Sequence, residues 1–187
     1  EAEALVKRGG TGDFLMVDVG WESSVLTLVV LGSVAGVVSF PLGRRKFLEG
    51  IAGALSVSLE EAEDWASQHI QEVEMQKLQA PIRETFGRVA ASWQAEFLKA
   101  LDSFYASGPL PQRIFFFGGG AHFPELQAAL RHPEWIKKYS PWNGPEVVIT
   151  RAENLFGGDT FRGALRGPEE VGLASLIIYS LEHKPIF

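Results

Sequence analysis

Three short apolar runs, separated by short breaks, dominate the first part of the chain. The runs are rich in Val, Leu and Phe, which favour a pleated strand, and the Ser-Ser and Gly-Ser dipeptides in the breaks suit tight turns. We therefore expect a three-stranded antiparallel meander, preceded by a glycine-rich incoming linker at residues 1–13. The first two runs are nearly continuous in apolar character, which predicts strands that are buried on both faces. The predicted strands are residues 14–19, 25–31 and 34–40.

A helical period follows these strands. Residues 44–56 carry apolar side chains on one side of a predicted helix. Ser58 and Glu61 form a capping-box pattern, which predicts the start of a second helix that runs to about residue 79. Pro81 opens a third helix, and a proline is favoured in a first turn. Its apolar residues recur every three or four positions: Ile82, Phe86, Val89, Trp93, Phe97, Leu101 and Tyr105.

The strand period returns in the last part of the chain and alternates with helical segments. We predict strands at 113–117 and 145–150, helices at 124–131 and 169–182, and a glycine-rich loop at 154–167. Three antiparallel strands followed by alternating helices and strands are typical of a ribonuclease-H-like α/β fold. The two-helix excursion at 57–110 is predicted to be a helical insertion subdomain. The core subdomain would then comprise residues 1–56 and 111–187.

Composition and charge restrict the function. The chain of 187 residues suits one domain, and its net charge of −6 argues against a nucleic-acid partner. Because there is no cysteine, disulfides and thiolate metal sites are excluded, which is consistent with a reducing compartment. Residues 1–8 do not resemble a signal peptide. The longest apolar reach, at 25–40, contains glycines and is shorter than the roughly 20 residues of a membrane helix, so no membrane span is expected.

Two loops carry the candidate chemistry. After the first strand, Asp18 and Gly20 are followed by two serines, Ser23 and Ser24. Such a turn can bring backbone N–H groups and hydroxyls against a phosphate while the carboxylate faces a metal-bound water. The same residue types are favoured in any hairpin turn, so a purely structural role stays open. The second loop is Gly118, Gly119 and Gly120, which can be a close backbone approach to a ligand or a strand-to-helix turn.

Four stretches resemble the actin-like ATPases, and most closely the branch of pilus-assembly PilM and cell-division FtsA. Together they span nearly the whole chain, which would correspond to the second, C-terminal half (domain 2) of a family member. Val17-Asp-Val-Gly20 with Ser23-Ser24 resembles the second phosphate loop, Leu59-Glu-Glu-Ala-Glu63 a helix start of that branch, Phe115 to Ala121 the adenosine loop, and Glu170-Val-Gly-Leu-Ala174 the closing helix.

The resemblance implies a site and a role. Asp18, Gly20, Ser23, Ser24 and the three glycines at 118–120 would bind ATP, with Asp18 holding Mg²⁺ through water. The protein would be a cytoplasmic scaffold that organises protein partners peripherally at the inner membrane, with self-association left open. It would be at most a slow ATPase, and this half alone would not be competent. A kinase of the sugar or acetate type is disfavoured, because no substrate-binding insertion of that kind is visible.

Two places depart from the pattern of the family. Ala66 stands where relatives usually have a lysine that reaches the nucleotide, and Trp21-Glu22 replaces small residues in the phosphate turn. Trp21 would either cap or block the cleft, and the charge of Glu22 would repel phosphate if it pointed inward. The alternative function is therefore a nucleotide-free interaction module of a secretion or pilus scaffold, comparable to GspL, in which ATP and Mg²⁺ binding has been lost.

Overall fold

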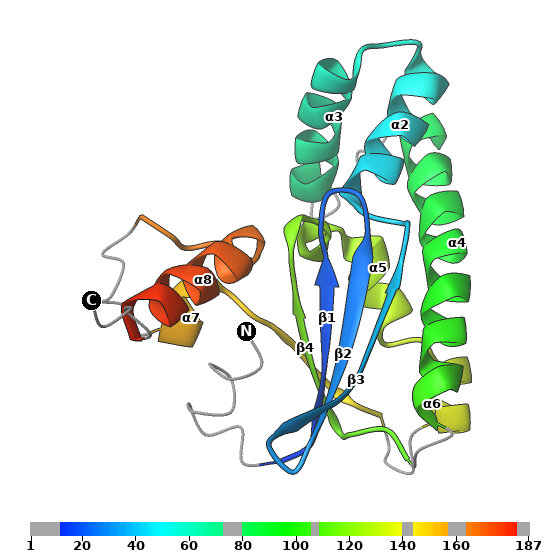
Figure 1. Ribbon diagram of the computed structural model, residues 1–187. Coiled ribbons are helices and arrows are strands. Elements are labelled where there is room, and N and C mark those ends of the chain that lie inside the picture. The colour runs from blue at the N-terminus through cyan, green and yellow to red at the C-terminus, as the bar shows by residue number, and fades with distance from the viewer. Residues whose placement is uncertain (1–11, 73–79, 106–108, 140–143, 157–163, 183–187) are drawn as a thin grey trace.

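A five-stranded mixed sheet forms the centre of the molecule (Figure 1). The computed structural model describes residues 12–72, 80–105, 109–139, 144–156 and 164–182. The strands are β1 (Phe14–Val19), β2 (Ser24–Val30), β3 (Ser33–Phe40), β4 (Arg113–Phe117) and β5 (Glu146–Ile149). Their order across the sheet is β3-β2-β1-β4-β5. The first three pair antiparallel, whereas β4 pairs parallel with both β1 and β5, so the predicted meander is confirmed.

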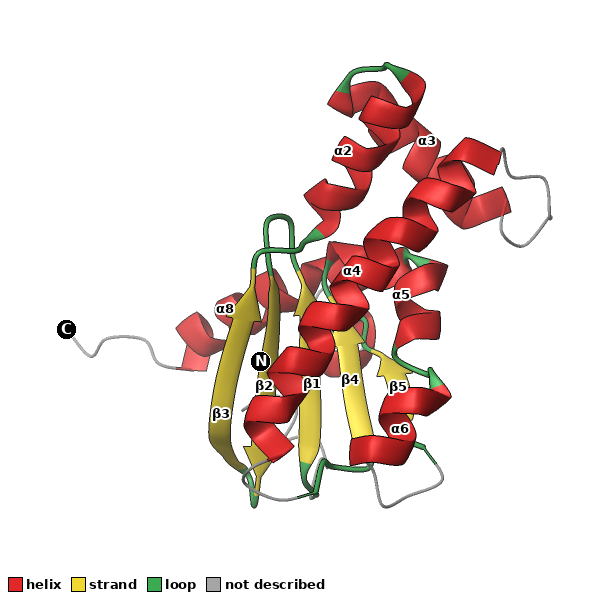
Figure 2. Cartoon of the chain, turned by 90° about the vertical axis from the view of Figure 1, so that its right-hand side faces the viewer, coloured by secondary structure: helices red, strands yellow, loops and turns green. Residues whose placement is uncertain are grey.

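Helices cover both faces of the sheet and make a three-layer α/β/α arrangement (Figures 1 and 2). One face carries α4 (Ala80–Tyr105), α5 (Pro124–Ala129) and α6 (Pro133–Tyr139), and the other carries α7 (Ala152–Phe156) and α8 (Val171–Glu182). The helices α2 (Arg44–Leu55) and α3 (Leu59–Glu72) extend beyond one end of the sheet, beside the first half of α4. The predicted α/β fold class, a meander followed by βαβα with additional helices, is confirmed.

Strand β1 is the centre of two hydrophobic clusters, one on each face. Leu15 and Val17 belong to the larger cluster on the side of α4, whereas Phe14 and Met16 belong to the smaller one on the side of α8. The predicted burial of both faces is therefore confirmed for β1. On the α8 side, Val29 is the one residue of β2 in the cluster, so most of that face of β2 is only half-buried.

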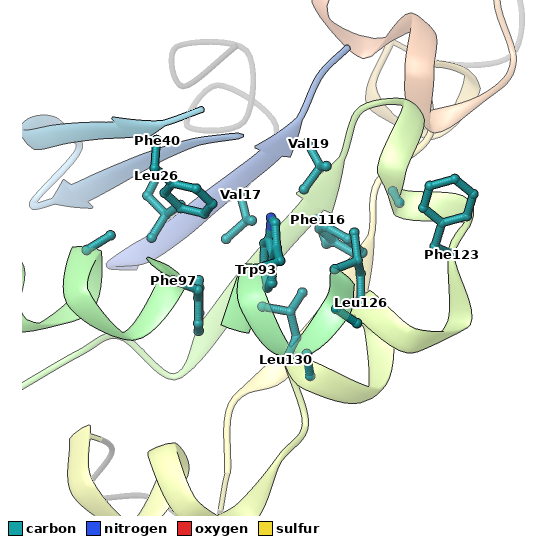
Figure 3. Close-up of a cluster of buried hydrophobic side chains, with 14 of the residues drawn as sticks. Val17, Val19, Leu26, Phe40, Trp93, Phe97, Phe116, Phe123, Leu126 and Leu130 are labelled. Carbon is teal, nitrogen blue, oxygen red and sulfur yellow. The ribbon is translucent and has the colours of Figure 1, made fainter. Parts of the chain in front are cut away.

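The larger core is dominated by aromatic rings from α4. Trp93 and Phe97 stack on each other with ring centroids 5.1 Å apart, and both are fully buried. Burying such a side chain contributes about 1.5–3 kcal/mol, so these rings fix α4 on the sheet. Figure 3 shows the sheet residues Val17, Val19, Leu26, Phe40 and Phe116 facing Trp93 and Phe97, with Leu126 and Leu130 completing the cluster.

Several predicted boundaries change. The final helix is divided into a 3-10 helix, η3 (Pro168–Glu170), and α8. The prediction of a loop at 154–167 is wrong at its start, because residues 154–156 belong to α7. Helix α6 was not predicted. The predicted end of the helix at residue 79 and most of the linker at 1–13 lie outside the described residues. Within the described ranges, no helix combines the length with the apolar character that a membrane crossing requires.

Candidate functional site

A pocket lies where two parallel strands end. Strands β1 and β4 run side by side, with Asp18 opposite Phe117, and the chain leaves both strands at the same edge of the sheet. Ligands of open α/β sheets bind outside the carboxyl ends of strands, so this edge is the expected place for a site. The pocket has a volume of about 280 Å³ and is lined by Asp18, Gly20, Trp21, Arg44, Phe117, Gly118, Gly119, Glu169 and Gly172.

The turn after β1 is tied to the start of α2. The Gly20 N–H donates to the carbonyl of Ser23 at 3.0 Å, which closes the turn. The Gly20 carbonyl accepts from the Arg44 N–H at 2.8 Å, and the Trp21 carbonyl accepts from the Arg45 N–H at 2.9 Å. These bonds satisfy N–H groups that the first turn of a helix leaves without an intrahelical partner. The turn is therefore held in place by α2 and forms a fixed wall of the pocket.

The three glycines of the second loop have different neighbours. Gly118 has a φ of +88°, which disfavours any side chain there, and a Cβ would overlap the end of β1. A Cβ on Gly120 would overlap the side chain of Val19. A Cβ on Gly119 would instead lie 3.1 Å from Cδ of Arg44, on the pocket wall. Overlap with β1 thus explains glycine at 118 and 120, whereas a Cβ on Gly119 would meet only the Arg44 side chain.

The structure brings together four of the predicted site residues at the pocket: Asp18, Gly20, Gly118 and Gly119. Ser23, Ser24 and Gly120 do not line it. The hydroxyl of Ser24 is fully buried, donates to the carbonyl of Leu42 at 2.6 Å and accepts the indole N–H of Trp93 at 2.8 Å. The Ser24 hydroxyl therefore stabilises the core on the side of α4 and does not point into the pocket.

The unusual pair Trp21-Glu22 is divided between the pocket and the surface. Trp21 lines the pocket and is 48% exposed, so this residue lies at the rim. The carboxylate of Glu22 accepts a hydrogen bond from Arg45 at 2.7 Å and does not line the pocket. Ala66, the position at which the resemblance predicts a lysine, is fully buried in the larger core. The charge of Glu22 is therefore directed away from the predicted phosphate position.

Two charged residues of the pocket, Arg44 and Glu169, were missed by the sequence prediction. Glu169 accepts a hydrogen bond from His122 at 2.6 Å, which joins the two 3-10 helices η2 (Gly119–His122) and η3. Burial alone would raise the pKa of Glu169. Hydrogen bonds from its own backbone N–H and from His122 outweigh this effect and hold the pKa below its ordinary value of 4.5. Near neutral pH the pocket therefore carries the Glu169 carboxylate on its wall.

The helix predicted from Pro124 begins at that residue. It is α5, which ends at Ala129 rather than at residue 131, and the 3-10 turn η2 precedes it. The carboxylate of Glu125, in its first turn, is hydrogen-bonded to Nε2 of the buried His69 side chain, with 2.7 Å between the two atoms. The first turn of this helix thus already carries an acidic side chain, that of Glu125. The capping box that was predicted at the start of α3 is confirmed: the Ser58 N–H donates to the Glu61 carboxylate, and the Glu61 N–H donates to the Ser58 hydroxyl.

Solved structures share this fold. A chain of the PilM–PilN type IV pilus biogenesis complex superposes with a TM-score of 0.62 and 19% identity, over 95% of this chain and 50% of that chain. The ethanolamine utilization protein EutJ from Carboxydothermus hydrogenoformans gives 0.54 and 16%, over 95% and 53%. ParM from Bacillus thuringiensis, solved with AMPPNP, gives 0.53 and 12%, over 91% and 47%.

These similarities establish the fold. The chain has the fold of an actin-like ATPase domain and resembles PilM, as the sequence predicted. It spans about half the length of the solved structures that it matches. No protein-family model and no curated protein matches the sequence.

Proposed function

We propose that this chain is half of an ATP-binding, actin-like scaffold protein of the pilus-assembly or cell-division type. The observation that carries the proposal is the pocket at the ends of β1 and β4, where Asp18 and Gly20 face Gly119 in an actin-like fold. The similar ParM structure was solved with AMPPNP, which supports nucleotide binding at this fold. Such a scaffold would organise its partners at the cytoplasmic face of the inner membrane.

The residues at the pocket fit magnesium and a polyphosphate. Mg²⁺ in nucleotide sites is usually held by one or two carboxylates plus phosphate oxygens and water. The carboxylates of Asp18 and Glu169 both line the pocket, which matches such a donor set. When bound, the ion would neutralise phosphate charge that these two carboxylates would otherwise repel. The backbone at Gly20 would lie along the phosphates, since this residue has no side chain in the way.

The exposed surface of helix α8 is evidence for a protein partner. Leu173, Leu176, Tyr179 and Leu181 are each more than half exposed, and all four lie on this one helix. Several large exposed apolar side chains on one helix are typical of a contact site for another protein. The similar PilM chain was solved in a complex with PilN, which is in keeping with a protein partner for this fold. We therefore infer that α8 lies in a protein interface.

A photo-reactive amino acid at position 176 tests this interface in cells. We expect it to form an adduct with a protein of a membrane-associated assembly, identified by mass spectrometry. The same group at position 84, on exposed α4 surface, is the control and should form none. Equal adducts at both positions, or none at 176, would contradict the interface.

One observation favours the alternative, a nucleotide-free scaffold module. The pocket contains two carboxylates, and its cation Arg44 already donates a hydrogen bond to Glu63 within the chain. A nucleotide would therefore meet net negative charge unless Mg²⁺ came with it. In this alternative the same fold acts only through contacts with other proteins.

Calorimetric titration of Mg-ATP into the protein separates the two functions. We expect micromolar binding that is lost in Asp18→Ala, because the carboxylate would hold the hydrated Mg²⁺. The control is Gly87→Ala on α4, where a new Cβ meets nothing within 4 Å, and this variant should bind as the wild type does. No binding heat at high protein concentration would reject ATP binding and leave the nucleotide-free module.

A further inference from the structure

Arg44 occupies part of the pocket that the proposed nucleotide would need. It is the first residue of α2, and its side chain lines the pocket beside Gly119. Its Cδ would lie 3.1 Å from a Cβ on Gly119, so the aliphatic stem packs directly on the face that this glycine leaves open. The surface of Gly119 is thus covered by the chain itself.

Three groups hold the Arg44 side chain in this position. Its stem packs on Gly119, its guanidinium donates to the carboxylate of Glu63 near the start of α3, and its central carbon lies 5.9 Å from the centroid of the Phe123 ring. A cation at this distance from an aromatic face is attracted to it. The side chain is 22% exposed. Arg44 therefore spans the gap between the glycine loop and α3.

The remaining pocket is small for a nucleotide. Its volume of about 280 Å³ lies just below the range of roughly 300–1,000 Å³ that is usual for pockets of small-molecule ligands. A base and ribose that lie between Gly119 and α3 would collide with the Arg44 stem. Phosphates at Asp18 and Gly20 would lie at the end of β1, whereas the Arg44 stem packs on Gly119, which follows the end of β4.

We propose that Arg44 is a specificity-determining residue that fills the nucleoside end of the pocket, held there by Glu63. This inference rests on the proposed nucleotide site and adds which residue determines the ligands that can enter it. A polyphosphate can enter the pocket as it stands, whereas a nucleoside enters only when Arg44 swings away. The pair Arg44–Glu63 then sets the affinity for nucleotide without taking part in phosphate binding.

Calorimetry with two probes, Mg-ATP and magnesium tripolyphosphate, tests the proposal. In Arg44→Ala we expect affinity for Mg-ATP to rise by about tenfold or more, equivalent to at least about 1.4 kcal/mol, with affinity for tripolyphosphate unchanged. Arg44→Lys keeps most of the stem and a positive charge and should bind Mg-ATP with the affinity of the wild type. Arg45→Ala is the matched control, because Arg45 pairs with Glu22 and does not line the pocket.

Glu63→Gln provides a second route that leaves Arg44 in place. Weakening the hold on the guanidinium should raise Mg-ATP affinity by a smaller factor than Arg44→Ala does. Weaker binding of both probes in Arg44→Ala would overturn the proposal, because Arg44 would then be a phosphate ligand. Wild-type binding of Mg-ATP that Arg44→Ala leaves unchanged would overturn it while the proposed function stands. No binding of either probe to any variant would overturn both.

Discussion

The hydroxyl of Ser24 joins strand β2 to two other parts of the chain, and its removal should be costly. In Ser24→Ala the indole N–H of Trp93 and the carbonyl of Leu42 lose their partner inside the core. A buried polar group left unpaired costs about 1–3 kcal/mol, so we expect the free energy of unfolding to fall by about that amount. Urea denaturation followed by far-UV circular dichroism measures it.

The neighbouring serine is the matched control. Ser23 is only half-buried, and its contribution to the turn is its backbone carbonyl, which Ser23→Ala retains. This variant should unfold within about 0.5 kcal/mol of the wild type. Equal losses in both variants would show that the hydroxyl of Ser24 is not specially placed.

Leu31 stands in a backbone conformation that suits another residue. It has a φ of 50°, is followed by Gly32 with a φ of 74°, and is 90% exposed in the hairpin between β2 and β3. Asn tolerates this left-handed conformation better than Leu, and it is favoured in turns with two positive φ values. Leu31→Asn should therefore raise the free energy of unfolding, by up to about 1 kcal/mol, in urea denaturation. Leu31→Gln removes the same apolar surface without this preference and should leave stability unchanged.

At single residues the sequence could predict the neighbourhood of the site but not the direction of each side chain. The acidic turn and the glycine loop were identifiable, and Asp18, Gly20 and Gly119 do meet at one pocket. The sequence could not show which of Ser23 and Ser24 points into the core. Side chains alternate between the two faces of a strand, and the face of each serine depends on the residue at which the strand begins. Arg44 belongs to a short basic run that is typical of a solvated helix start, and only tertiary packing brings it against Gly119.

Two helical glycines distinguish packing from helix propensity. Gly87 in α4 is exposed, and a Cβ there would meet nothing within 4 Å. Because glycine is about 1 kcal/mol worse than alanine in a helix interior, Gly87→Ala should stabilise the protein by about that amount. Gly50 in α2 has the opposite environment, since its Cβ would lie 2.7 Å from a methyl group of Thr85 in α4. Gly50→Ala should lower the melting temperature, whereas Gly87→Ala should raise it. A rise in both would mean that α2 and α4 do not pack closely at Gly50.

The contact between η2 and η3 should depend on pH. The pKa of Glu169 is held below its ordinary value of 4.5, with hydrogen bonds from its own N–H and from His122 outweighing burial. A carboxyl with a lowered pKa in the folded state contributes stability that is present above the unfolded pKa and lost as pH falls through the folded value. We expect a loss of melting temperature below about pH 4.5 that is smaller in Glu169→Gln. The same slope in both proteins would show that other carboxyls are responsible.

Elements with a strong period were predictable, and short ones were not. Helix α4 has apolar positions along its whole length and matches its predicted range within one residue at its start. Helices α6 and α7 have seven and five residues, too few to establish a 3.6-residue period. Helix α6 forms because Trp135 and Tyr139, one turn apart, are both buried against the rest of the core. That reason lies in tertiary packing.

For the whole molecule, element order was sufficient to predict the sheet. Three antiparallel strands followed by two parallel ones leave few ways to build a single sheet, since connections between parallel strands need a crossover. The sequence could not show how the helical excursion meets the core. The structure places Ala62 and Ala66 of α3 in the same hydrophobic cluster as Val17 and Leu26 of the sheet. The division of the chain at residues 57 and 110 stays a prediction.

This shared cluster leads us to expect that the whole chain unfolds as one unit. Native-state hydrogen exchange should give the amides of α3 and β1 opening free energies that agree within about 1 kcal/mol. Phe86→Ala tests the coupling, because Phe86 packs on His69 of α3 and on Phe123, next to the pocket. Its loss should cost about 3–5 kcal/mol and lower protection in both elements equally. If only the amides of α2 and α3 lose protection, the helical excursion is a separate cooperative unit.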